Sequence, residues 1–322
     1  MDAVIEWLLA SDEPWTRYRT LVDLLGESPS TPAASSARRE ILAHPKIKEL
    51  ISRANGWGEL PLKRHNDASH PLYALSTLAD LGLVGDDPGM QVLVEKLLVH
   101  QSNQGAFQTL MNVSKAFGGT GEDVWTWMSC DAPTVLYCLI SFGLGSDPRV
   151  QKALDHLIGL VDSNGWRCIC APELGKFHGP GRRTDPCPVA NLFTLKALSL
   201  VPQLVHGSAA HTGAEMLLSH WADPANPKPY LFGAGTDFRK LKYPFIWYDI
   251  LHVAHVLSRY AFVRDDPRYQ QMVLAITTQA GPGGRYTATS MYQSWKGWSF
   301  ADKMNPSPWL TCLVHGILAG IS

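Results

Sequence analysis

The sequence predicts an all-α protein folded as an α/α toroid, in which five to six helix pairs surround a central cavity. Three observations lead to this expectation. Segments of one form recur with a period near sixty residues, a glycine and an aromatic residue follow them, and strand patterns are sparse. Because these repeats cover most of the 322-residue chain, we expect a single domain over residues 1–322.

The outer helix of each pair is marked by an Asp-Pro pair before an amphipathic segment. Such pairs stand at 87–88, 147–148 and 266–267, so that their prolines lie 60 and 119 positions apart, close to one and two periods. Asp is a favoured N-cap residue and Pro suits the first helical position, so each pair predicts a helix start. The remaining outer helix is expected at 211–221, which lacks the proline.

The inner helices are predicted from segments whose apolar residues recur at three- and four-residue spacing and cover nearly the whole helix surface. Helices that are apolar all round are buried, and an open solenoid would expose their concave side, so closure into a ring is favoured. A ring places the starts of all inner helices at one mouth of the cavity. The expected inner helices are 15–25, 70–83, 130–144, 187–201, 247–260 and 307–321.

Composition and charge restrict the partners. The 28 Lys and Arg balance 29 Asp and Glu, which gives a net charge of -1 and no electrostatic field for a nucleic acid. We expect no membrane span and no signal peptide, because no apolar run is long enough and the first residues are acidic. Six cysteines in a chain of this length do not form a disulfide scaffold, so a reduced, cytoplasmic protein is predicted.

The segment from Gln101 to Phe107, Gln-Ser-Asn-Gln-Gly-Ala-Phe, resembles the repeat signature of the terpenoid cyclase and protein prenyltransferase superfamily. In this superfamily, the β subunits of protein prenyltransferases hold zinc with an Asp-x-Cys and with the His of an Asp-x-x-His on successive inner helices. Similar motifs stand here at 185–187 and 249–252. The resemblance implies zinc on Asp185, Cys187 and His252, with Arg182 and Arg183 before them to bind a diphosphate or another anion.

The chemistry of these residues agrees with a catalytic zinc site, since a thiolate, a carboxylate and an imidazole fill three positions and leave the fourth open. Asp249 would orient His252 or ligate the metal, and His255 is a competing ligand. A thiolate-rich site for zinc or an iron–sulfur cluster is the alternative, because soft thiolates select these metals. Its members would be Cys130, Cys168, Cys170 and Cys187. Helix caps, a packed thiol and a hydrogen-bonded helix histidine are the structural interpretation of the same residues.

Other side chains near the predicted inner-helix starts are candidates for catalysis and substrate binding. Asp131 is predicted as a general acid or base, or as an exposed cap. His70 is predicted as a ligand or proton shuttle, or as a cap. An aromatic wall would bind apolar or cationic groups, or it would be ordinary core. The aromatic residues expected to bind substrate are Trp127, Trp247, Tyr248 and Trp309.

From these residues we expect an enzyme, namely a zinc-dependent transferase, lyase or hydrolase that activates a thiol, hydroxyl or water on a small apolar or isoprenoid-like substrate. Two alternatives stay open. One is a non-catalytic toroid that binds an apolar ligand or a protein partner, and the other is an acid-initiated, terpene cyclase-like lyase that uses Asp131 or Asp249. No nucleotide cofactor is expected, since the sequence contains neither a P-loop nor a dinucleotide-binding fingerprint. Nothing in the sequence indicates an oligomeric state.

Overall fold

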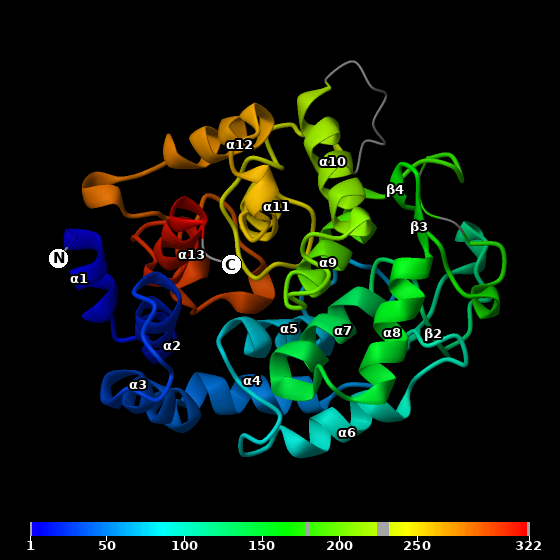
Figure 1. Cartoon of the computed structure of the whole chain (residues 1–322). Helices are drawn as coiled ribbons and strands as arrows, with labels where there is room; N and C mark the ends of the chain where they lie inside the picture. The colour runs from blue at the N-terminus through cyan, green and yellow to red at the C-terminus, as the bar shows by residue number, and fades with distance from the viewer. Residues whose placement is uncertain (1, 178, 180, 224–231, 321–322) are drawn as a thin grey trace. The chain divides into compact units, whose positions relative to one another are not determined.

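The computed structural model describes residues 2–177, 179, 181–223 and 232–320, and α-helices dominate this part of the chain (Figure 1). Thirteen α-helices and four short strands are found there. The all-α prediction is therefore confirmed. The chain divides into two compact units, which we call the terminal unit (residues 1–50 and 234–322) and the middle unit (residues 51–233). The predictions of one domain and of ring closure stay predictions.

The middle unit contains inner and outer helices in alternation along the chain. The inner helices α5, α7 and α9 contact one another in sequence order, and the outer helices α8 and α10 pack against α7 and α9 (Figure 1). A π-helical turn, η3 (Ile140–Leu144), continues α7. The inner helices are α5 (Pro71–Asp80), α7 (Ala132–Leu139) and α9 (Pro188–Leu198), and the outer helices are α6 (Gln91–Val99), α8 (Pro148–Gly159) and α10 (Ser208–Ala222).

Burial of the helices follows the sequence pattern. Every residue of α5, α7 and α9 is buried, whereas α8 buries one stripe at three- and four-residue spacing. A helix that is apolar all round is stable only inside the protein, so these inner helices form the core of the middle unit. The N-cap prediction holds at Asp147 and Asp266, whose side chains accept from backbone N–H groups two residues further on at 2.8 Å.

The same prediction was wrong at Asp87. The helix α6 begins three residues beyond the expected proline, at Gln91. Gly89 has φ of +85°, a left-handed conformation that interrupts a helix. The carboxylate of Asp87 accepts instead from the N–H of Val84 at 2.7 Å and so closes a turn before the helix.

The strands join the helices of the middle unit. The strands β1 (Thr109–Met111) and β2 (Val124–Thr126) form an antiparallel pair with Thr109 opposite Thr126. The strands β3 (Val161–Asp162) and β4 (Gly165–Trp166) form a second antiparallel pair. Both pairs are too short to form a layer of their own, so they serve as connections.

The glycine-aromatic signature has a packing role at Gly165 and Trp166. The indole of Trp166 is completely buried and donates to the carbonyl of Leu157 at 2.7 Å. The amide oxygen of Asn191 accepts from the backbone N–H of Trp166 at 3.1 Å. A Cβ at position 165 would stand 2.5 Å from that oxygen, so only glycine fits beside it. The signature thus fixes a loop against the inner helix α9.

The Gln101 signature also fastens a loop. The side-chain amide of Gln101 donates to the carbonyl oxygens of Gly105 and Arg149, each at 2.7 Å. Arg149 lies in the first turn of α8, so this one glutamine holds the loop to the next outer helix. The signature is therefore a structural device of the repeat.

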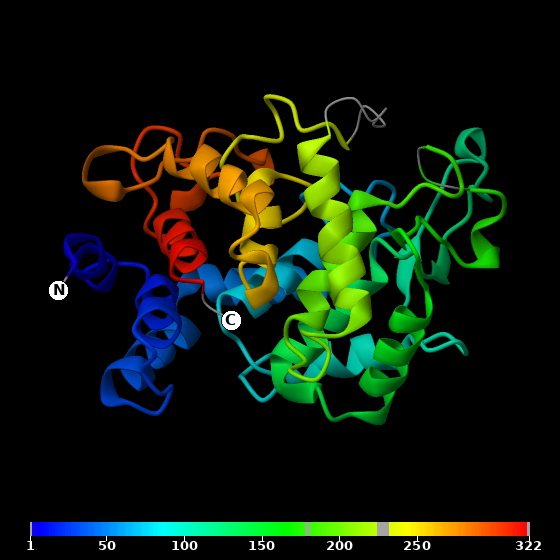
Figure 2. The ribbon, with the colours of Figure 1, turned by 45° about the horizontal axis from the view of Figure 1, so that its top comes forward.

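In the terminal unit, α11, α12 and α13 contact one another, and α2 contacts α3 and α13 (Figure 2). The predicted inner helices 15–25, 247–260 and 307–321 correspond to α2 with η1, to α11 and to α13, the last position of 307–321 lying outside the described residues. The elements of this unit are α1 (Ala3–Leu9), α2 (Pro14–Arg19), η1 (Thr20–Leu24), α3 (Pro32–Ala43), α11 (Ile250–Leu257), α12 (Pro267–Thr277) and α13 (Pro308–Ala319), and α4 (Pro45–Asn55) runs from this unit into the middle one.

No helix among the described residues combines the length and apolar character needed to cross a membrane. The cytoplasmic location stays a prediction.

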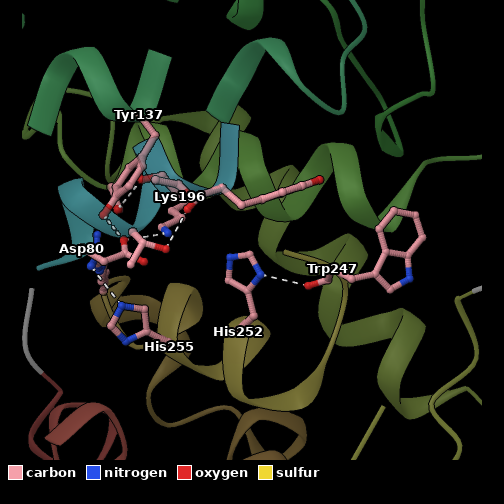
Figure 3. Close-up of polar contacts among 11 residues, drawn as sticks. Asp80, Tyr137, Lys196, Trp247, His252 and His255 are labelled. Carbon is pink, nitrogen blue, oxygen red and sulfur yellow. Dashed lines mark hydrogen bonds and ion pairs between the residues drawn. The ribbon is translucent and has the colours of Figure 1, made fainter. Parts of the chain in front are cut away.

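A buried ion pair links the three inner helices of the middle unit (Figure 3). Lys196 on α9 places its Nζ 2.9 Å from Oδ1 of Asp80 at the end of α5, and both side chains are almost completely buried. The hydroxyl of Tyr137 on α7 donates to the same oxygen at 2.6 Å, and the Lys196 ammonium lies 4.2 Å from the centre of the Tyr137 ring. The charge is compensated by direct partners, which burial requires.

We expect Lys196→Met to lower the free energy of unfolding by about 3–5 kcal/mol, because it removes the ammonium that pairs with the buried Asp80 carboxylate. Adding Asp80→Asn should recover part of that loss, since the amide carries no charge. Urea unfolding at neutral pH measures both effects. Lys152→Met, on the exposed side of α8, is the matched control and should cost less than about 0.5 kcal/mol. A loss below about 1 kcal/mol for Lys196→Met would show that the pair does not stabilise this core.

Candidate functional site

Three thiols meet at the helix starts of the middle unit. Cys130 lies just before α7, Cys168 follows β4, and Cys187 is the N-cap residue of α9. The Sγ of Cys130 is 3.9 Å from that of Cys168 and 3.8 Å from that of Cys187, and all three sulfurs lie within 4.8 Å of one another. All three are free thiols. Of the thiolate-rich set predicted from the sequence, the structure brings these three together.

Backbone hydrogen bonds hold the three cysteine-bearing segments in place. Ser129 donates its N–H to the carbonyl of Ile169 at 2.8 Å, and its hydroxyl donates to the carbonyl of Arg167 at 2.7 Å. The N–H of Cys187 donates to the carbonyl of Trp166 at 2.8 Å. Both neighbours of Cys168 are therefore bonded to the segment that carries Cys130, and Trp166, two residues before Cys168, is bonded to Cys187. The sulfur cluster is positioned by the fold before any ligand is added.

The three thiols share their protons unequally. Hydrogen bonds from the Cys130 and Cys168 thiols lower the pKa of Cys187 well below its usual value. Hydrogen bonds with Cys168 and Cys187, together with burial, raise the pKa of Cys130. The pKa of Cys168 is raised to about 12, because the contact with Cys187 and burial outweigh the opposing contact with Cys130. The first thiolate of the cluster therefore forms on Cys187, at a helix N-terminus that favours a negative charge.

Other predicted residues near this cluster do not join it. The thiol of Cys170 donates to the carbonyl of Phe177 at 3.1 Å. The carboxylate of Asp185 accepts from the backbone N–H of Arg182 at 2.7 Å, so it closes a turn ahead of Cys187. Arg182 and Arg183 are exposed. Their predicted role in binding an anion stays a prediction.

Asp131 pairs with His65, a contact that the sequence did not predict. Oδ1 of Asp131 lies 2.9 Å from Nδ1 of His65, and Oδ2 has no hydrogen-bond partner among the described residues. Burial alone would lower the pKa of His65, but the charge and hydrogen bond of Asp131 outweigh it and raise the pKa to about 9. Asp131 is buried and makes no capping bond to α7, so it is not the exposed cap that was the alternative.

His70 is the N-cap residue of α5. Its Nδ1 accepts from the N–H of Leu72 at 3.2 Å, and its Nε2 lies 3.2 Å from the carbonyl of Leu60. Both ring nitrogens thus contact the backbone, and burial lowers the pKa of the imidazole. This geometry agrees with the predicted capping role, and a role as ligand or proton shuttle stays a prediction.

Asp249 occupies the start of the inner helix α11 in the terminal unit. Its side chain is completely buried, and Oδ1 accepts from the N–H of His252 at 3.0 Å as the helix cap. Oδ2 has no hydrogen-bond partner among the described residues. Burial raises the pKa of Asp249 to about 7, against the opposing charge of Lys242. A carboxyl group with this pKa carries its proton on half of the molecules near neutral pH.

The two histidines of α11 make local contacts (Figure 3). Nδ1 of His252 lies 3.1 Å from the carbonyl of Trp247, and its ring stacks on Phe245 with centres 4.5 Å apart. Nε2 of His255 lies 3.1 Å from an Arg259 guanidinium nitrogen. Since His252 belongs to the terminal unit and Cys187 to the middle unit, the predicted set of Asp185, Cys187 and His252 draws on both units and stays a prediction.

The predicted aromatic residues are packed against neighbours within their own units. The indole N–H of Trp127 donates to Gln104 at 3.1 Å, and its ring is buried beside Ala106 and Ala132. Tyr248 stacks on Phe238 with ring centres 4.7 Å apart. The ring of Trp309 meets that of Tyr243 edge to face at 5.6 Å, and Trp247 is half-buried. Substrate binding by these rings stays a prediction.

Comparisons with known proteins find similar chains among solved structures only. No family model matches the chain, and no curated protein matches it. Among solved structures, it is similar to a protein from Actinoplanes, at 15% identity and a TM-score of 0.42 over 96% of this chain and 89% of that one. It is also similar to the type II terpene cyclase MstE from Scytonema, at 15% identity and a TM-score of 0.44 over 90% and 82%.

A variant of MstE in complex with geranylgeranyl dihydroxybenzoate, its substrate, is similar at 14% identity and a TM-score of 0.43 over 90% and 81%. No substrate or activity passes from these proteins to this chain.

Two polar contacts in the middle unit were not predicted from the sequence. His65 and Asp131 are 66 positions apart, and no periodic pattern relates a loop residue to a helix start at that separation. The contact between Asp80 and Lys196 could have been predicted, because each is a charged residue inside an otherwise apolar inner helix. A charge at such a position predicts a buried partner of opposite sign.

We expect Asp249→Asn to reduce the pH dependence of stability. The folded pKa of about 7 exceeds the unfolded value of about 4, so the folded state holds the proton more tightly. This stabilisation is present below about pH 4 and is lost as the pH rises through 7, up to about 4 kcal/mol in all. The amide retains the helix cap and cannot titrate. Urea unfolding at several pH values between about 4 and 8 measures the difference.

Asp266→Asn is the control for that measurement. Asp266 caps α12 in the same way, but hydrogen bonds from Arg268 lower its pKa, so its contribution is lost as the pH falls instead. Equal pH dependence in the wild type and in Asp249→Asn would contradict the assignment of a buried, proton-holding carboxyl.

Proposed function

We propose that this protein is an acid-catalysed enzyme, a terpene cyclase-like lyase in which Asp249 donates a proton to an apolar, isoprenoid-like substrate. One observation carries the proposal. Asp249 is completely buried, one of its oxygens caps α11, and the other has no hydrogen-bond partner among the described residues. A buried polar atom without a partner costs about 1–3 kcal/mol, and active sites are a common reason for retaining one.

The capping bond gives this acid a fixed orientation. Because Oδ1 accepts from the N–H of His252, the carboxyl cannot rotate freely, and Oδ2 is the atom left to carry a proton. Burial favours the neutral form and keeps the pKa near 7, so a proton is available at neutral pH. A general acid works best when its pKa lies close to the working pH. Asp249 meets both requirements.

The surroundings of Asp249 suit a cationic intermediate. Tyr248 and Tyr292 are close enough for the Asp249 charge to raise the pKa of each phenol, and burial is the larger cause in both. Phe238 stacks on Tyr248 and extends the aromatic surface. Aromatic faces stabilise a cation by about 0.5–2 kcal/mol each, and the carboxylate left after proton transfer adds an opposite charge.

The proposed substrate class follows from this chemistry. A proton from Oδ2 adds to a double bond or an oxygen of the substrate, and the resulting cation is attacked by another double bond of the same chain. Loss of a proton from the cyclic cation ends the reaction, and solvent returns a proton to Asp249. Isoprenoid chains carry repeated double bonds on an apolar chain, so they fit both the acid and the aromatic surface.

The predicted zinc-dependent alternative finds less support in the local contacts. The Asp185 carboxylate accepts from a backbone N–H, and Nδ1 of His252 faces the carbonyl of Trp247. These are the contacts of a turn and of a core histidine. The non-catalytic alternative, a protein that binds an apolar ligand, would also use the aromatic surface. It does not explain why a carboxyl group is buried at Asp249.

The test is conversion of farnesol, geranylgeraniol and squalene by the purified protein, with cyclic products detected by gas chromatography and mass spectrometry. We expect at least one substrate to be converted, and Asp249→Asn to lower the rate by about 10²–10⁴-fold, because the amide cannot donate a proton that it does not carry. Asp266→Asn, the cap on the exposed outer helix, should keep the wild-type rate.

Two results would contradict the proposal. The first is an unchanged rate in Asp249→Asn. The second is binding of these substrates, measured by a thermal shift of the wild type, without conversion of any of them. The second result would support the non-catalytic alternative.

A further inference from the structure

We propose that the Sγ atoms of Cys130, Cys168 and Cys187 bind a zinc ion in the middle unit. The proposal does not rest on the function proposed above. Its residues belong to a different unit from Asp249, and its test measures metal content and not activity.

The sulfur spacing is that of a tetrahedral zinc site. Zinc–sulfur bonds are about 2.3 Å long, so two sulfurs on one tetrahedral zinc are about 3.8 Å apart. The observed separations from Cys130 are 3.9 Å to Cys168 and 3.8 Å to Cys187. A disulfide would require about 2.05 Å, and these sulfurs are not bonded to each other. Two of the three separations therefore match those of sulfurs on one zinc ion, and the third, between Cys168 and Cys187, is within 4.8 Å.

The fold holds these thiols rigidly. The N–H of Cys187 is bonded to the carbonyl of Trp166, two residues before Cys168, and Ser129 bonds to both neighbours of Cys168. Cys130 and Cys187 are almost completely buried, while Cys168 is partly exposed. A metal could thus enter beside Cys168 and meet ligands that need little rearrangement. Preorganised ligands of this kind raise metal affinity, because little ordering entropy is lost on binding.

The ligand count favours zinc over an iron–sulfur cluster. Iron–sulfur clusters are generally held by four cysteines, whereas Cys170, the nearest further thiol in the sequence, donates to the carbonyl of Phe177. Thiolates are soft ligands that bind zinc strongly, and zinc accepts three protein ligands with a fourth position for another group. These three cysteines therefore suit a zinc site with three thiolate ligands.

Among the described residues, the Asp131–His65 pair is a candidate for the fourth position. His65 is close enough to Cys168 for their charges to interact, and Oδ1 of Asp131 lies 2.9 Å from its Nδ1. Zinc-bound histidines commonly donate their second nitrogen to a carboxylate in this way. Either the other nitrogen of His65 or a water molecule held by it would complete the tetrahedron. Asp131 then acts as a positioning residue.

The test is the zinc content of protein purified without a chelator, measured by inductively coupled plasma mass spectrometry. We expect about one zinc per chain, and less than about 0.2 in each of the variants Cys130→Ser, Cys168→Ser and Cys187→Ser. Cys170→Ser and Cys138→Ala should keep the wild-type zinc content. They are matched controls, since Cys170 lies next to the site and Cys138 is a buried thiol on α7. His65→Ala should weaken zinc binding by about 10–100-fold.

A second measurement covers the case in which a cysteine variant fails to fold. In the wild-type protein, iodoacetamide should modify Cys130, Cys168 and Cys187 only after zinc has been removed with a chelator, as mapped by peptide mass spectrometry. Replacing zinc with cobalt should give a sulfur-to-cobalt charge-transfer absorption. Zinc-free wild-type protein, a disulfide between two of the three cysteines, or modification that is unchanged by the chelator would overturn the proposal.

Discussion

The structure depends on the burial of helices that are apolar on every side. Such helices bury their ends as well as their faces, and the first N–H groups of a helix must still be satisfied there. Polar residues are therefore required in the core at each inner-helix start. His70 caps α5, Asp249 caps α11 and Ser307 caps α13, each with its side chain buried. The buried polar side chains of the repeat therefore lie at the helix starts, where the backbone N–H groups need an acceptor.

The helix starts meet this requirement in different ways. At α13 the hydroxyl of Ser307 accepts from the N–H of Leu310 and lies 3.0 Å from the hydroxyl of Ser299, so it is satisfied by its neighbours. At α11 a carboxylate has two oxygens for one capping bond, so the second remains as a proton carrier. At α9 the cap position holds Cys187, whose sulfur meets two other thiols. The candidate reactive groups are thus those at cap positions whose side chain has an atom that the capping hydrogen bond does not use.

The helices could be predicted in detail because they rest on local patterns. Helical periodicity placed all the inner helices to within a few residues, and the capping chemistry of Asp-Pro placed α8 and α12. The failure at Asp87 has a local cause as well, since Gly89 lies in the left-handed region and stops the helix from starting.

The sites were less predictable because they depend on distant contacts. The three-thiol cluster joins segments that are 38 and 57 positions from Cys130, and periodicity carries no information about that meeting. All three cysteines had nevertheless been named from the sequence, together with Cys170, as the alternative thiolate-rich site. The pairing of His65 with Asp131 was not predicted, and Asp131 was expected to be exposed as the alternative to catalysis. Burial of a single polar side chain is decided by packing that residue type alone does not reveal.

The core of the terminal unit holds a carboxylic acid, Asp249, that keeps its proton near neutral pH. The most direct measurement is the titration of the Asp249 carboxyl carbon by nuclear magnetic resonance in labelled protein, with Asp249→Asn used to assign the signal. We predict a pKa of about 7, raised by burial. A pKa at or below about 4, the ordinary value for aspartate, would contradict the claim.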